Sequence, residues 1–147
     1  MTNVIIFNIV LLSACGFALV RGAAPERTVA VMMLLAALAG FATQNLGRRY
    51  EHVELSVTLI DLALLVGLIA VALRANRFWP MWLASLHIVA VAFQGVRAYI
   101  HDLPGWSYQR AVSLIAYPML LILIVGCQRH FQRAQRRGSE PSWSPLI

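Results

Sequence analysis

Five apolar segments that are almost free of charge follow one another along nearly the whole chain, and arginine or a group of polar residues separates each from the next. About 20 residues of α-helix cross the roughly 30 Å hydrocarbon core of a bilayer, and each segment has about that length. The pattern therefore predicts five transmembrane helices, over residues 3–20, 28–46, 54–73, 78–99 and 109–130.

The connections between these segments are short, so consecutive helices are expected to run antiparallel. We predict an all-α membrane protein in which residues 1–137 form one compact bundle of five transmembrane helices. Residues 138–147 contain glycine, serine and proline and are predicted to form a loose C-terminal tail. Because the number of spans is odd, the two termini are predicted to lie on opposite sides of the membrane.

Two local signals refine this bundle. Ala36 with Gly40, and Ala63 with Gly67, have the small-residue spacing that lets neighbouring helices approach closely. The region around residues 79–82 carries two tryptophans at the start of the fourth helix, where aromatic side chains commonly meet the lipid headgroups.

The arginines predict the orientation. Eight lie on the side that holds the C-terminus and four lie on the other side, so the positive-inside rule places the C-terminus in the cytoplasm and the N-terminus outside. The difference comes from the segment after the last helix. Its four arginines are expected to contact anionic lipid headgroups, or a partner protein, and a bacterial inner membrane is the expected location. These residues are Arg129, Arg133, Arg136 and Arg137.

Composition agrees with a membrane protein. Hydrophobic residues make up 60% of the chain, charged residues 12%, and the mean hydropathy is +0.72, whereas about a quarter of the residues in a soluble domain are charged. The formal net charge of +6 comes from arginines at helix ends and not from a continuous basic face. We therefore expect no nucleic-acid partner.

Asp61 is the residue that most needs an explanation, because it interrupts the third apolar segment. An unpartnered carboxylate at such a depth costs roughly 2.5–3.5 kcal/mol on insertion scales, so Asp61 is expected to face protein or water. Glu51, Glu54, Thr58 and Asp61 follow one another at spacings of three, four and three residues. If the helix begins at Glu51, these four residues share one helix face.

The fourth helix carries a matching polar stripe. His87, Gln94 and His101 recur every seven residues, and Arg97 follows Gln94 by three. In an antiparallel hairpin, helix depth places Asp61 level with Gln94 and Arg97, and places His87 deeper. We predict that Asp61 pairs with Arg97 and Gln94 inside the bundle.

This pairing has two interpretations that the sequence does not separate. One is a structural polar clasp between helices. The other is a path for a proton or small cation, or a small polar pocket, open to the outer face. The functional prediction is a homo-oligomeric membrane protein that conducts or binds a proton, small cation or small polar solute. The alternative is a non-catalytic accessory subunit of a larger membrane complex.

No enzyme activity and no cofactor are expected. The chain has no His-Glu-x-x-His, Gly-x-Ser-x-Gly, Cys-x-x-Cys or phosphate-binding glycine motif. Imidazole and carboxylate groups do gather near the predicted outer surface, but no segment has a metal-ligand spacing, so no metal site is predicted. These residues are Glu51, His52, Glu54, His101 and Asp102. Cys15 and Cys127 are expected to behave as small buried hydrophobic residues.

Overall fold

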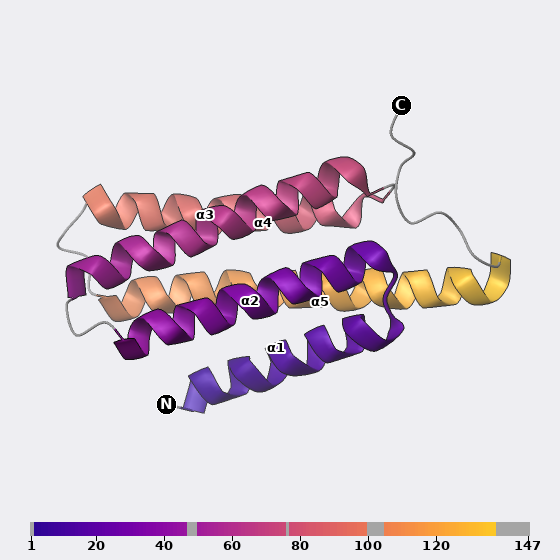
Figure 1. Cartoon of the computed structure of the whole chain (residues 1–147), viewed down its shortest axis with the longest axis horizontal. Coiled ribbons are helices and arrows are strands. Elements are labelled where there is room, and N and C mark those ends of the chain that lie inside the picture. Colours follow the sequence, from indigo (N-terminus) through magenta and orange to yellow (C-terminus); the bar gives the residue numbers. More distant parts are fainter. Residues whose placement is uncertain (1, 47–49, 76, 100–104, 138–147) are drawn as a thin grey trace.

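The computed structural model describes residues 2–46, 50–75, 77–99 and 105–137, and this part of the chain forms five helices and no strands (Figure 1). Side chains are described for residues 5–43, 56–75, 77–96, 114–133 and 135. The helices are α1 (Thr2–Arg21), α2 (Ala24–Leu46), α3 (Tyr50–Arg74), α4 (Trp79–Tyr99) and α5 (Gly105–Arg137). The tail predicted over residues 138–147 lies outside the described residues.

Four of the helices are longer than predicted, whereas α4 begins one residue later than predicted. Helix α2 starts at Ala24, where Pro25 fits the first turn because its missing N–H would have no partner there. Glu26 also lies in this turn, close to the positive end of the helix dipole. Helix α5 continues through Pro118 and extends to Arg137, well beyond the predicted end of the fifth segment.

Four of the helices are long and apolar enough to cross a membrane. Their qualifying stretches are Ala24–Thr43, Ser56–Arg74, Trp79–Val96 and Leu114–Arg133, and helix α1 has a shorter apolar stretch, Ile5–Arg21. Large apolar side chains are exposed on every helix, among them Leu12, Leu38, Val66, Trp82 and Leu121. Such a surface suits lipid and not water, so the chain is an integral membrane protein.

The five helices close into a ring. Each helix packs against the next one along the chain, α5 returns to α1, and α2 also touches α5 across the middle (Figure 1). Closely packed core residues gather toward the end of the bundle where α1 runs into α2. The fully buried ones include Cys15, Ala18, Val29, Leu68, Leu83, Leu120 and Leu123.

One of the two predicted small-residue contacts is confirmed. At Gly67, an added Cβ would overlap the end of the Met32 side chain, so the absence of a side chain lets α2 lie close to α3. At Gly40 no described atom of the chain lies within 4 Å of the place a Cβ would take, so this glycine does not face a neighbouring helix in the described part of the bundle. Sequence spacing alone does not reveal which small residue faces a neighbouring helix.

Candidate functional site

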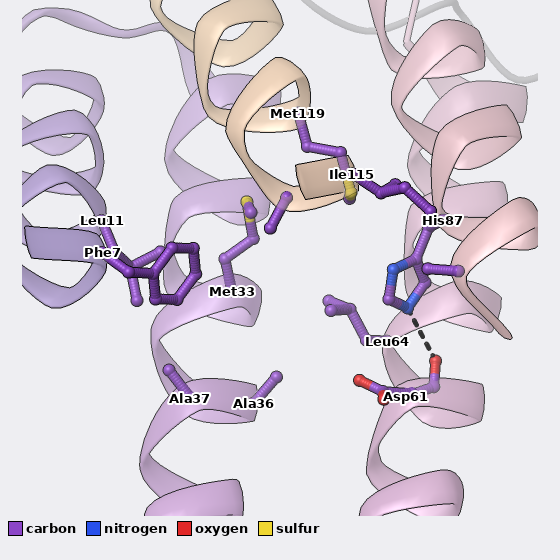
Figure 2. A pocket seen from close by; sticks show the side chains of 12 residues that line it. Phe7, Leu11, Met33, Ala36, Ala37, Asp61, Leu64, His87, Ile115 and Met119 are labelled. Carbon is purple, nitrogen blue, oxygen red and sulfur yellow. Dashed lines mark hydrogen bonds between the residues drawn. The ribbon is translucent and has the colours of Figure 1, made fainter. Parts of the chain in front are cut away.

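A cavity of about 180 Å³ lies within the ring, and all five helices contribute to its wall (Figure 2). It lies on the far side of the closely packed core from the α1–α2 connection. Apart from Asp61 and His87, the side chains that line it are apolar. They are Phe7, Leu11, Met33, Ala36, Ala37, Leu64, Ala90, Ile115, Ala116 and Met119.

Asp61 enters this cavity from α3, and Figure 2 shows its carboxylate directed toward the interior. The side-chain amide of Gln94, on α4, donates a hydrogen bond from Nε2 to Asp61 Oδ2. Asp61 therefore faces the bundle interior and meets Gln94, as the depth argument predicted. Gln94 is 9% exposed, and its Oε1 atom has no hydrogen-bond partner among the described residues.

His87, which lies about two turns before Gln94 on α4, contacts the same residue. Its Nε2 atom lies 3.0 Å from the main-chain oxygen of Asp61, and the side chain is only 6% exposed. A carbonyl oxygen can only accept, so Nε2 carries the proton and donates. In a neutral ring this leaves Nδ1 as an acceptor, and Figure 2 shows that nitrogen on the cavity side of the ring. Helix α4 thus contacts Asp61 at two points, through Gln94 at the carboxylate and through His87 at the main-chain oxygen.

The other predicted site residues are only partly within the described structure. Thr58 is half-buried on α3 and has a partner. The side chains of Glu54 and Arg97, and the whole of His101, lie outside the described residues, so the Asp61–Arg97 pair stays a prediction. Near the C-terminal end of α5, Arg129 and Arg133 are exposed. The backbone of Arg136 and Arg137 continues α5, and their side chains are not described.

A second polar cluster, which the sequence pattern does not predict, lies at the opposite end of the bundle. Arg77, in the α3–α4 connection, places Nη1 3.3 Å from Glu26 Oε1 and Nη2 3.0 Å from His130 Nδ1. The Glu26 side chain is fully buried and that of Arg77 is 6% exposed. Arg77 was expected to act as a topology-setting arginine, whereas here it also joins α2 to α5.

The protonation pattern of this cluster follows from its donors. A guanidinium has only N–H donors, so His130 Nδ1 must accept and cannot carry a proton while this contact exists. Glu26 Oε2 has no hydrogen-bond partner among the described residues. The sequence did hold a signal, since Glu26 is one of only six acidic residues and lies at the end richest in arginine.

Two aromatic side chains make further contacts that join α5 to other helices at this end of the bundle. Trp79 packs against Gly126 of α5, where an added Cβ would lie 3.1–3.3 Å from the indole ring. The Arg21 guanidinium lies 4.8 Å from the centre of the Phe131 ring, which ties the end of α1 to α5 by a cation–π contact. The two tryptophans expected at the interface therefore differ, because Trp82 is 68% exposed whereas Trp79 is half-buried against α5.

An apolar layer separates the cavity from this second cluster. His87 follows Arg77 by ten residues, which corresponds to about 15 Å of helix rise. Core residues occupy that interval, including Leu68, Leu83 and Leu120. The buried polar side chains among the described residues are Glu26, Arg77, His87 and Gln94, and none lies within the layer.

Comparison of the chain with protein-family models, with curated proteins and with solved structures finds no match. The fold and the site therefore define the class of the protein. It is an all-helical integral membrane protein with a mainly apolar cavity between its helices, and this cavity carries one carboxylate and one imidazole.

Proposed function

We propose that this protein binds a small, mainly apolar molecule in the cavity between its five helices. The observation that carries the proposal is the composition of the cavity wall, which is apolar except for Asp61 and His87. Ligand sites in proteins have this character, with a few convergent polar groups in a mostly apolar enclosure. A cavity of about 150 Å³ is known to hold benzene, so a cavity of about 180 Å³ suits a molecule of roughly that size.

Binding is better supported than conduction. A path for protons or cations needs polar groups or water along its whole length, and the interval between His87 and Arg77 is filled by apolar core side chains. The polar groups of the cavity also hold one another, since both His87 and Gln94 bond to Asp61. These contacts fix the geometry of a site, which is what a ligand needs.

Filling the cavity provides a test with a matched control on the same helix. Ala90 lines the cavity and is 5% exposed, whereas Ala92 is exposed on the outer surface of α4. We expect Ala90→Phe to weaken the binding of benzyl alcohol at least tenfold, with Ala92→Phe close to wild type. Isothermal titration in phosphatidylcholine nanodiscs measures this. Equal binding by both variants would place the ligand elsewhere and refute the proposal.

Liposome flux distinguishes conduction from binding. We expect proton flux through wild-type protein to be no greater than in empty liposomes. Flux that exceeds this level, and that falls in both Asp61→Asn and His87→Ala, would favour a conduction path over a binding site.

We further propose that all five helices cross the membrane, with the C-terminus in the cytoplasm of a bacterial cell. Support comes from the apolar stretch of α1 and from the arginines near the end of α5. Reporter fusions after Met1 and after Ile147 test this. We expect the cytoplasmic reporter to be active only at Ile147, and a periplasmic reporter active there would reverse the orientation.

Association with other chains completes the proposal. A homo-oligomer is the expected state, and anionic headgroups are the expected contacts of the arginines in the last turns of α5. The alternative, an accessory subunit, predicts a heteromeric complex in mild detergent. Mass measurement of the purified protein separates a homo-oligomer from such a complex.

A further inference from the structure

We infer that the cavity ligand is a small primary amine, bound as its ammonium ion with Asp61 as the counter-charge. This inference rests on the proposed function and names the ligand class of the same site. It follows from which hydrogen-bonding groups the cavity offers and which it lacks.

The polar groups on the cavity wall are acceptors. Gln94 already donates to Asp61 Oδ2, and this leaves the carboxylate with further acceptor capacity directed into the cavity. The donor of the His87 ring is used on the Asp61 carbonyl, so the neutral ring presents the acceptor Nδ1. A ligand must therefore bring the donors, and an ammonium group brings three.

Charge points to the same ligand class. Among the described residues, the Asp61 carboxylate has a hydrogen bond from a neutral amide and no ion pair. Arg97, whose side chain lies outside the described residues, is the predicted counter-charge with which the ligand would compete. A carboxylate enclosed by apolar side chains is stabilised by an opposite charge much more than by a neutral donor. A ligand with a carboxylate or phosphate would instead meet the like charge of Asp61 and the acceptor Nδ1 of His87, so such a ligand is disfavoured.

The apolar wall determines the size and the apolar character of the rest of the ligand. On the side of the cavity opposite Asp61, Phe7 and Leu11 of α1 and Met33 of α2 present carbon and sulfur (Figure 2). A body about the size of a benzene ring fits the volume, and the amine must lie at one end of it. A zinc ion is disfavoured, because one carboxylate and one imidazole fall short of the three or four ligands that zinc takes.

The test compares benzylamine, benzyl alcohol and toluene, which share a ring and differ in the group that would reach Asp61. Titrations at pH 7.5 in phosphatidylcholine nanodiscs avoid adsorption of the amine to anionic lipid. We expect wild-type protein to bind benzylamine at least tenfold more tightly than benzyl alcohol. In Asp61→Asn this preference should disappear, and a circular-dichroism spectrum like that of wild-type protein shows that the variant is folded.

Each other outcome has a distinct meaning. If all three compounds bind wild type equally and Ala90→Phe weakens them, the cavity is a binding site but the ammonium inference is overturned. A benzylamine preference that persists in Asp61→Asn overturns the inference as well. If none of the compounds binds, both the inference and the proposed function fail.

Discussion

Replacing Glu26 with glutamine is expected to lower the free energy of unfolding by about 3–5 kcal/mol, the usual cost of removing one partner of a buried ion pair. Glutamine has nearly the same shape as glutamate, so the packing is kept and only the charge is lost. Arg77, which is 6% exposed, would then be buried without its counter-charge. Equilibrium unfolding in mixed micelles with increasing dodecyl sulfate measures the effect.

Two further variants show whether the ion pair is the cause. Arg27 is the next residue in the chain and is exposed, so Arg27→Gln changes one charge at the same helix end and should cost less than about 0.5 kcal/mol. The double variant Glu26→Leu with Arg77→Leu removes both charges and should recover most of the loss. A Glu26→Gln effect no larger than that of Arg27→Gln would mean that the pair contributes nothing to stability.

Replacing Gly22 with alanine is expected to destabilise the protein by about 1–3 kcal/mol, as overpacking in a well-packed site does. Gly22 follows α1, and its N–H donates to the Ala18 oxygen at 2.9 Å. An added Cβ would overlap that main-chain oxygen and would lie 2.7 Å from the Cβ of Glu26. Neither neighbour is the end of a flexible side chain, so the backbone between α1 and α2 has to move.

The control is Gly16→Ala in the middle of α1, where no described atom lies within 4 Å of the new Cβ. This variant should stabilise the helix by about 0.5–1 kcal/mol, the difference in helix propensity between the two residues. Since Gly22 is in contact distance of Glu26, the two sites should also couple. We expect Gly22→Ala to cost less in a Glu26→Gly background, which lacks the Cβ that the new side chain would meet, than in wild type, and strict additivity would contradict the contact.

Both predictions concern the end of the bundle where the sequence predicts only topology-setting arginines. The position of an arginine near a helix end does not show the direction of its side chain. Arg77 turns inward since Glu26 lies buried within reach on a neighbouring helix and His130 offers an acceptor on a third. Both contacts of Arg77 therefore join residues that are more than 50 positions apart in the chain.

The sequence by itself determined the class of fold and the environment, because the length and apolarity of each segment are local properties. It also determined that Asp61 faces the bundle and meets Gln94, since helix rise and antiparallel order are enough to match depths. Only the tertiary structure decided which helix faces enclose space. The cavity depends on how five helices pack, with small residues such as Ala36 and Ala90 leaving room beside Asp61. Likewise, the Glu26–Arg77–His130 cluster arises from three elements that only the closed ring brings together, because side-chain contacts across a bundle are set by packing and not by spacing along the chain.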